Sequence, residues 1–156
     1  MAHAHDLADA LAALDAHYQA MPPVATMGLA VAGYDGARLR LHAPLARHVN
    51  DKGCAFGGSL VSLMTLAGWG LVTLRLHDAG IDADVFVADS EVRYLQPLFA
   101  DLAAEAELDE GVDWDAALAD LRGRGRMRVA LVARVRLPDG VVAAQAHARF
   151  VAVAKG

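Results

Sequence analysis

The residues best suited to chemistry lie in one short segment, Asn50–Ser59. It carries an asparagine, an aspartate and the glycine pair Gly57-Gly58 directly before a long apolar run. If that run is a helix, its first backbone N–H groups have no partner inside the helix, and the helix dipole is positive there. Such a terminus suits a carbonyl oxygen, and glycine lets a bound molecule approach the backbone closely. Alternatively, the two glycines only allow the helix to pack tightly against a sheet.

A second group of candidates is basic. Four arginines alternate with other residues near the C-terminal third of the chain: Arg122, Arg124, Arg126 and Arg128. Guanidinium groups suit phosphates, so Arg124 and Arg126 are candidates for binding a nucleotide end. The alternative is a solvated strand face.

Two carboxylates, Asp89 and Glu91, lie two residues apart in the segment VADSEVRYL. In a strand this spacing places them on one face, where either could be a general base. Arg93 could instead be an ordinary partner for them. The single cysteine, Cys54, has no evident cationic neighbour, which favours a buried inert thiol.

The histidines do not share metal-ligand spacing within one element, apart from His3 and His5 near the terminus. We therefore expect no metal. They are His3, His5, His17, His42, His48, His77 and His147.

Composition bounds the class of protein. The chain has 156 residues, of which 56% are hydrophobic and 21% charged, so wholesale disorder is excluded. Its net charge of −5 disfavours a nucleic-acid-binding role. One cysteine excludes an internal disulfide, and the N-terminal sequence lacks the pattern of a secretion signal. We expect a cytoplasmic protein.

The segment Gly53–Leu74 carries no charge over 22 residues and is long enough to cross a bilayer. Glycine, serine and threonine dilute its hydrophobicity, and amphipathic segments surround it. A helix buried on all sides is the favoured interpretation, and no membrane span is expected.

The remaining pattern is mostly strand. A helix is expected over 6–21, stopped by Pro22-Pro23, and a short one over 114–121, capped by Asp113 and followed by a flexible 122–126. The expected strands are 27–31, 39–43, 85–95, 102–108, 126–137 and 141–153. An antiparallel sheet wrapped around the single long apolar helix accounts for this order. The sequence predicts one α+β domain over residues 1–156.

Three motifs carry a resemblance to a known family. The sequences AFGGSL (55–60), AGWGL (67–71) and RYLQP (93–97) resemble the thioesterase domain fused to some bacterial GNAT-type acetyltransferases, a branch of the hotdog-fold thioesterases. The similarity extends from about residue 21 to 153. It implies a curved antiparallel sheet of about six strands around one central helix. It also implies a homodimer or higher oligomer with continuous sheets, and the segment VADSEVRYL, which mixes Val87 and Tyr94 with charges, suits a semi-polar seam.

The resemblance implies roles for single residues. Asn50 matches an asparagine that binds the thioester oxygen or a water; its alternative is a turn asparagine. Asp51 could supply the acid, as a loop residue does in another hotdog branch; otherwise it is a solvated aspartate. Better-known relatives carry histidine where this chain has Phe56, and Asp or Glu nine residues later, where it has Thr65.

The expected function is therefore hydrolysis of a thioester of coenzyme A or of acyl carrier protein, without a cofactor beyond the coenzyme A of the substrate. The catalytic candidates are Asn50, Asp51, Gly58, Ser59, Thr65 and Asp89. The substrate-binding candidates are Phe56, Gly57, Leu60, Met64, Arg124 and Arg126, with Leu63 and Trp69 as further lining of the acyl pocket. Ser62 is a further candidate in the same run, and Met64 could instead be a core filler. Phe56 and Thr65 favour the alternatives, a non-hydrolytic acyl-CoA-binding module or a regulatory dimer partner of an acetyltransferase.

Overall fold

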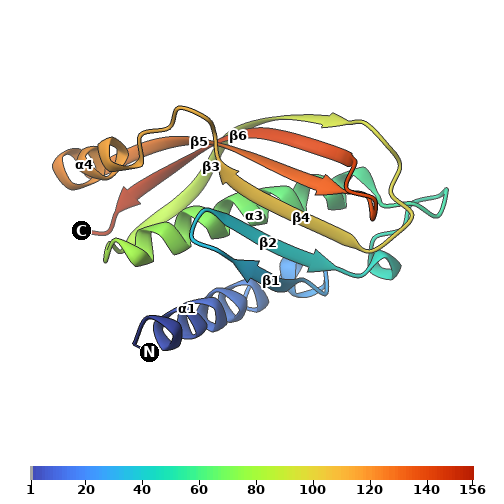
Figure 1. Cartoon of the computed structure of the whole chain (residues 1–156), viewed down its shortest axis with the longest axis horizontal. Helices are drawn as coiled ribbons and strands as arrows, with labels where there is room; N and C mark the ends of the chain where they lie inside the picture. The colour runs from blue at the N-terminus through green and yellow to red at the C-terminus, as the bar shows by residue number, and fades with distance from the viewer. Residues whose placement is uncertain (1) are drawn as a thin grey trace.

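A six-stranded antiparallel sheet forms most of the molecule in the computed structural model, which describes residues 2–156, with side chains from residue 6 onward (Figure 1). The strand order across the sheet is β1-β2-β4-β5-β6-β3. The strands are β1 (Ala30–Tyr34), β2 (Arg38–Ala43), β3 (Ala83–Tyr94), β4 (Leu102–Leu108), β5 (Arg126–Arg136) and β6 (Val142–Ala154). The predicted α+β architecture, an antiparallel sheet with one long central helix, is confirmed.

The long helix α3 (Gly57–Asp78) lies against the inner face of the sheet. Its apolar side chains are buried there, and the inward positions of β2, β4, β5 and β6 supply the opposing surface. The most apolar 18-residue window of α3 has a mean hydropathy of 1.4, which would suffice for a bilayer, but 56% of that window is buried inside the molecule. This burial agrees with the predicted central core helix.

Helix α1 (Ala2–Gln19) packs beside α3 through one apolar stripe, in which Ala10, Leu14 and Tyr18 are buried at helical spacing. The Tyr18 hydroxyl donates to the carbonyl oxygen of Leu66 in α3 at 2.7 Å. Pro22 does not simply end the helix: it opens a separate short helix, α2 (Pro22–Ala25), because proline is tolerated in a first turn. A single turn of 3-10 helix, η1 (Leu45–Arg47), follows β2.

Helix α4 (Trp114–Arg124) begins where the sequence predicts. The Asp113 side chain caps it by accepting from the Ala116 N–H at 3.0 Å. The expected flexible segment 122–126 is wrong, because the helix continues to Arg124. Gly125 then ends it with a φ of +73°, the left-handed conformation that glycine adopts without strain.

Strand β3 forms one edge of the sheet and pairs on one side only, with β6. Several large apolar side chains on it are exposed, among them Phe86, Val87 and Tyr94. A β-bulge between Val87 and Asp89 shifts the pairing register of β3 against β6. An unpaired and partly apolar edge of this length is a surface on which another strand can pair.

Candidate functional site

The start of α3 is the centre of the candidate site. Phe56 has an extended backbone and is the N-cap of the helix, so the glycine pair forms the first two helical positions. The first hydrogen bonds of the helix run from the N–H groups of Ser59 and Leu60 to the Phe56 carbonyl, at 3.0 and 3.1 Å. The N–H groups of Gly57 and Gly58 precede that ladder and lie at the positive end of a 22-residue helix.

Two aromatic rings flank the glycine pair. A Cβ added to Gly58 would lie 2.6 Å from Cε1 of Phe56, and one added to Gly57 would lie 3.4 Å from Cε1 of Tyr94. Tyr94, on β3, also donates its hydroxyl to the Gly57 carbonyl at 3.2 Å. Gly58 thus makes room for the Phe56 ring, whereas a Cβ at position 57 would make only ordinary contact with Tyr94, and both rings remain more than half exposed.

The loop before α3 is closed by Asn50. Its Oδ1 accepts from the N–H groups of Lys52 and Cys54, at 2.8 and 3.2 Å, and its Nδ2 donates to Cys54 Sγ at 3.2 Å. Asn50 therefore acts as a turn asparagine in this structure. Cys54 is buried, as expected.

Asp51 lies at the tip of this loop. Its side chain is 80% exposed and pairs with the ammonium group of Lys52 at 2.9 Å. The contacts of the Asp51 carboxylate are with its own loop neighbour and not with α3.

His48 and Ser59 form a hydrogen-bonded pair that the sequence did not reveal. The imidazole Nδ1 of His48 lies 2.8 Å from Ser59 Oγ, and its Nε2 lies 2.8 Å from the carbonyl oxygen of Met27. His48 is only 5% exposed, whereas Ser59 is partly exposed. Eleven residues separate the pair, and no local periodicity links a loop histidine to a helix serine at that separation.

One stripe of α3 runs from the glycine pair toward β3. Gly58, Ser62, Thr65 and Trp69 follow one another at spacings of four, three and four, which places them on one face of the helix. Trp69 fixes the direction of this face by donating its indole N–H to the Val85 carbonyl of β3 at 3.0 Å. Thr65, at the position where the resembled thioesterases carry a carboxylate, donates its hydroxyl to the Val61 carbonyl at 2.8 Å.

The expected apolar lining is buried elsewhere. Leu60, Leu63 and Met64 are at most 4% exposed and belong to the core between α3 and the sheet. The alternative interpretation of Met64, a core filler, describes its position. The stripe that faces β3 is accessible, whereas these three side chains are not.

Asp89 and Glu91 share a face, as their spacing predicts, but this face looks away from α3. Asp89 is paired with Arg149 and Glu91 with His147 across β3 and β6, on the outer side of the sheet. The Asp89 carboxylate forms an ion pair with the Arg149 guanidinium, which lowers the pKa of that carboxyl. The structure does not bring Asp89 to the start of α3.

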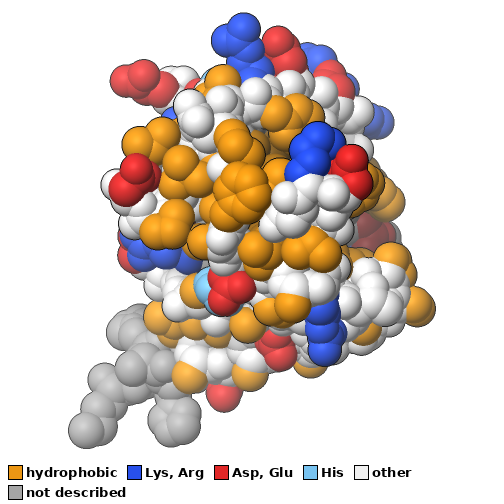
Figure 2. Space-filling model, turned by 90° about the vertical axis from the view of Figure 1, so that its right-hand side faces the viewer, with side chains coloured by type: hydrophobic (Ala, Val, Ile, Leu, Met, Phe, Trp, Pro, Cys, Tyr) orange, Lys and Arg blue, Asp and Glu red, His pale blue; other side chains and the backbone are white. Residues whose placement is uncertain are grey.

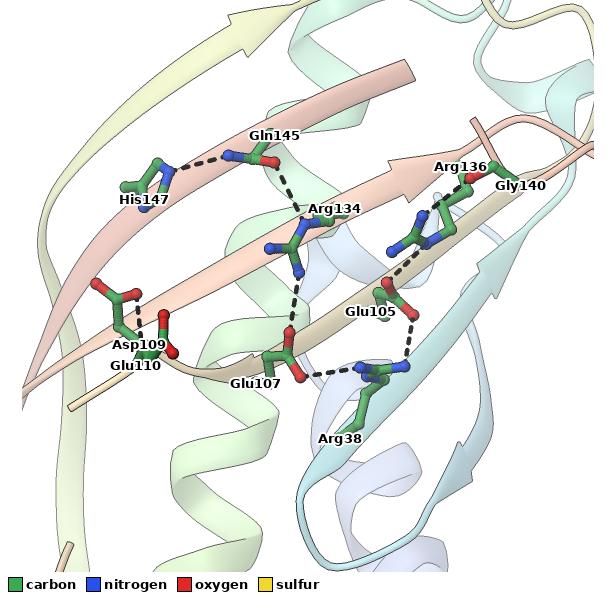
Figure 3. A network of polar contacts seen from close by, with 10 residues as sticks. All are labelled: Arg38, Glu105, Glu107, Asp109, Glu110, Arg134, Arg136, Gly140, Gln145 and His147. Carbon is green, nitrogen blue, oxygen red and sulfur yellow. Dashed lines mark hydrogen bonds and ion pairs between the residues drawn. The ribbon is translucent and has the colours of Figure 1, made fainter. Parts of the chain in front are cut away.

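The same outer face carries a network of ion pairs (Figure 3). Arg38 and Arg134 each donate to the Glu107 carboxylate, at 2.9 and 3.0 Å. Arg136 donates to Glu105 at 2.8 Å, and the Glu105 side chain is only 11% exposed. The partners in these ion pairs lie on neighbouring strands, so their contacts arise only when the sheet forms.

Helix α4, which ends at Arg124, and the start of β5 at Arg126 lie at the opposite end of the molecule from the start of α3 (Figure 1). The guanidinium of Arg75, in the last turn of α3, stacks over Trp114 of α4 at 4.7 Å and so fixes α4 at that end. The four arginines Arg122, Arg124, Arg126 and Arg128 form the arginine cluster. A helix of 22 residues is about 33 Å long, so one chain does not bring this cluster and its glycine pair together.

The end of the molecule where α3 begins is apolar at its surface. Figure 2 views this end and shows hydrophobic side chains gathered across the middle of the face. Five large apolar side chains of the loops and of β3 near this end are more than half exposed: Val49, Phe56, Tyr94, Leu95 and Phe99. A helix terminus that can polarise a carbonyl, beside an apolar surface and a polar helix stripe, suits a ligand with a carbonyl next to an apolar group. In the described part of the chain, no group of three or more His, Cys, Asp or Glu side chains could hold a metal ion.

Known structures share this architecture. The putative thioesterase from Shewanella oneidensis is 28% identical, with a TM-score of 0.83, over 93% of this chain and 98% of that one. A protein of unknown function from Chlorobaculum tepidum is 24% identical, with a TM-score of 0.85, over 91% and 93% of the two chains. A probable thioesterase from Pseudomonas aeruginosa is 20% identical, with a TM-score of 0.69, over 88% and 90%. The predicted hotdog fold is thereby confirmed.

A family model described as "Putative thioesterase (yiiD_Cterm)" matches residues 11–154, which include every helix and strand that contributes to the candidate site. With its central helix, its glycine pair and this match, the chain belongs to that thioesterase family of the hotdog superfamily.

Proposed function

We propose that this protein hydrolyses thioesters of coenzyme A, with the acyl carbonyl bound at the start of α3. The observation that carries the proposal is the pair of N–H groups of Gly57 and Gly58 ahead of the hydrogen-bond ladder of α3. Both groups and the helix dipole favour the oxyanion that forms when a nucleophile attacks the thioester carbonyl. The acyl group lies against Phe56 and Tyr94, whose rings flank these glycines.

A homodimer joined along β3 completes the proposed site. The edge of β3 is unpaired in one chain and carries exposed Val87 and Tyr94, so a second copy can cover it by continuing the sheet. Antiparallel pairing of the two β3 strands brings the first residues of one strand beside the last residues of the other. The face of α3 that carries Thr65 then looks toward the partner copy.

The same pairing offers a role for the arginine cluster. Ala83 begins β3 at the end of the molecule that holds α4, and Tyr94 ends β3 beside Gly57. In the dimer, the arginine cluster of one subunit therefore lies nearer to the glycine pair of its partner than to its own. Arg124 and Arg126 there bind the phosphates of the coenzyme A held by the partner.

The test is release of free thiol from a panel of acyl-CoAs, from acetyl to long-chain and aromatic acyl groups. Gly58→Ala should lower turnover, because its Cβ displaces the Phe56 ring and crowds the carbonyl site. Gly123→Ala is the control, because a Cβ there meets nothing within 4 Å. Absence of thiol release from the whole panel, and from acyl groups on a carrier protein, would contradict the proposal.

A second candidate, a non-hydrolytic acyl-CoA-binding module, is favoured by Phe56 and Thr65, which replace the histidine and carboxylate of the resembled thioesterases. A thermal shift with coenzyme A but no thiol release would support it. Co-purification with an acetyltransferase would extend this module to the regulatory role that the resemblance suggests. In either case the proposed location is the cytoplasm, where coenzyme A thioesters are made and used.

A further inference from the structure

The buried imidazole of His48 has a defined hydrogen-bonding state. A backbone carbonyl can only accept, so the contact between Nε2 and the Met27 oxygen places the ring proton on Nε2. In the neutral ring Nδ1 is then an acceptor, and the Ser59 hydroxyl at 2.8 Å donates to it. A serine hydroxyl held by an imidazole, whose other nitrogen is oriented by a third group, is the arrangement that activates serine as a nucleophile.

From this geometry, we propose that Ser59 is the nucleophile of the thioesterase reaction and His48 its general base, with the Met27 carbonyl fixing the imidazole. The inference rests on the proposed function and names the chemistry of the same site. Ser59 is the third residue of α3, directly after the two glycines whose N–H groups bind the carbonyl oxygen. It is partly exposed, as a nucleophile must be, whereas its base is buried and held on both ring nitrogens.

The other catalytic candidates do not supply this base; Glu91, like Asp89, lies on the outer face of the sheet, opposite His147. Thr65, at the position of the family's usual carboxylate, uses its hydroxyl on the Val61 carbonyl. Asp51 is exposed and paired with Lys52, and Asp89 lies on the outer face with Arg149. Among these groups and His48, only His48 accepts a hydrogen bond from a hydroxyl at the start of α3.

The reaction then has two steps. Ser59 Oγ attacks the thioester carbon while its proton passes to His48 Nδ1; the C–S bond breaks, and the thiolate takes that proton and leaves as coenzyme A thiol. A water molecule then attacks the resulting serine ester and gives a proton to Nδ1. The C–Oγ bond breaks, Oγ regains the proton from Nδ1, and the carboxylic acid leaves. The sum is one water and one thioester consumed, and one acid and one thiol formed.

The first experiment measures kcat and KM of Ser59→Ala, His48→Gln and the double variant, each corrected for the folded fraction by circular dichroism. Each single variant should lose about a thousandfold or more in kcat with KM changed only a few-fold, and the double variant should be no slower, because the two groups act as one unit. Thr26→Ala is the control, because it removes a hydroxyl that donates to the Pro23 carbonyl at 2.8 Å rather than to His48, at the position directly before Met27. A Ser59→Ala protein that keeps kcat within tenfold of the parent overturns the proposal.

The second experiment stays decisive even if a variant fails to fold, because it uses the unaltered chain. A fluorophosphonate probe should attach to Ser59, and peptide mass mapping identifies the labelled residue. Attachment should be abolished in His48→Gln. If that variant fails to fold, prior saturation of the unaltered protein with coenzyme A should slow the attachment instead. Attachment elsewhere, or none, overturns the proposal. If the parent protein releases no thiol from any thioester, the proposed function fails; if it does so and Ser59→Ala does so equally well, only the nucleophile assignment fails.

Discussion

Among the single residues near the start of α3, Asp51 shows how sequence proximity differs from proximity in space. It is the carboxylate nearest in sequence to the glycine pair, yet its side chain is 80% exposed and pairs with Lys52. An exposed pair of this kind contributes little to stability and leaves the carboxylate in water. The charge of Asp51 therefore has no contact with the groups that would hold a thioester.

We expect Asp51→Asn to leave kcat within about twofold of the parent, because asparagine keeps the size of the side chain and the loop is closed by Asn50 instead. Steady-state thiol release measures this. A loss of a hundredfold or more, with coenzyme A binding unchanged, would restore Asp51 as the general base.

At the scale of elements, contact between α1 and α3 depends on one glycine. A Cβ on Gly70 would lie 2.1 Å from the Tyr18 hydroxyl oxygen and 2.7 Å from Cδ2 of Leu39. Tyr18 is fully buried, and its burial raises the pKa of the phenol, so the hydroxyl stays protonated and donates to Leu66. The absence of a side chain at position 70 is what lets α1 lie so close to α3.

Gly70→Ala should therefore destabilise the fold by about 1–3 kcal/mol, the usual cost of overpacking a core. Adding Tyr18→Phe should recover part of that loss, because it removes the nearest clashing atom, and the double-mutant cycle measures the recovery. Urea denaturation gives all four free energies of unfolding. Strict additivity of the two changes would show that the hydroxyl does not contact position 70.

The ion pairs on the outer face of the sheet contribute to the stability of the fold. The hydrogen bond from Arg38, followed by that from Arg134, lowers the pKa of Glu107 below its ordinary value of 4.5. The Glu107 carboxylate therefore binds a proton less readily in the folded state than in the unfolded state. The resulting stability is present in full above the unfolded pKa and is lost as the pH falls through the lower pKa of the folded state.

Glu107→Gln should accordingly lower the free energy of unfolding at pH 7 by up to about 1 kcal/mol, since the carboxylate is a third exposed and partly screened. The difference from the parent should shrink as the pH is lowered through the carboxyl range. Urea melts at pH 7 and at pH 3 compare the two proteins. An equal difference at both pH values would mean that charge at position 107 does not act through Arg38 and Arg134.

At the scale of the whole molecule, the distribution of functional groups favours two copies over one. The glycine pair and the arginine cluster lie at opposite ends of a helix about 33 Å long, and the edge of β3 between them is unpaired. If the two ends serve one ligand, they do so across a dimer.

Val87→Arg tests this arrangement, because it places a charge on the exposed apolar part of β3. Light scattering at micromolar concentration should give a dimer mass for the parent and a monomer mass for the variant. The affinity of Val87→Arg for coenzyme A should fall about as much as that of the double variant Arg124→Ala/Arg126→Ala. The loss of affinity in the double arginine variant should shrink as the salt concentration rises. Val141→Arg, at an equally exposed valine away from β3, is the control. A parent that is monomeric excludes the dimer.

Local patterns in the sequence determined the elements of this protein. Apolar alternation located every strand except β1, which was expected over 27–31 and begins only at Ala30, after a turn; the uncharged run located the central helix, and Asp113 marked the start of α4. These signals are reliable because side-chain direction repeats every two residues in a strand and every 3.6 in a helix. The glycine pair likewise marked the first turn of α3, since helix termini carry local signals.

Tertiary structure decided which groups meet. Strict alternation would put Val87 and Asp89 on one face, but the bulge between them turns Val87 toward Phe150 and Asp89 toward Arg149, on opposite sides of the sheet. The contact between His48 and Ser59, and that between His48 and Met27, join segments 11 and 21 residues apart. No periodicity within one element encodes such contacts; they arise only when the loop before α3 folds back against the turn that precedes β1.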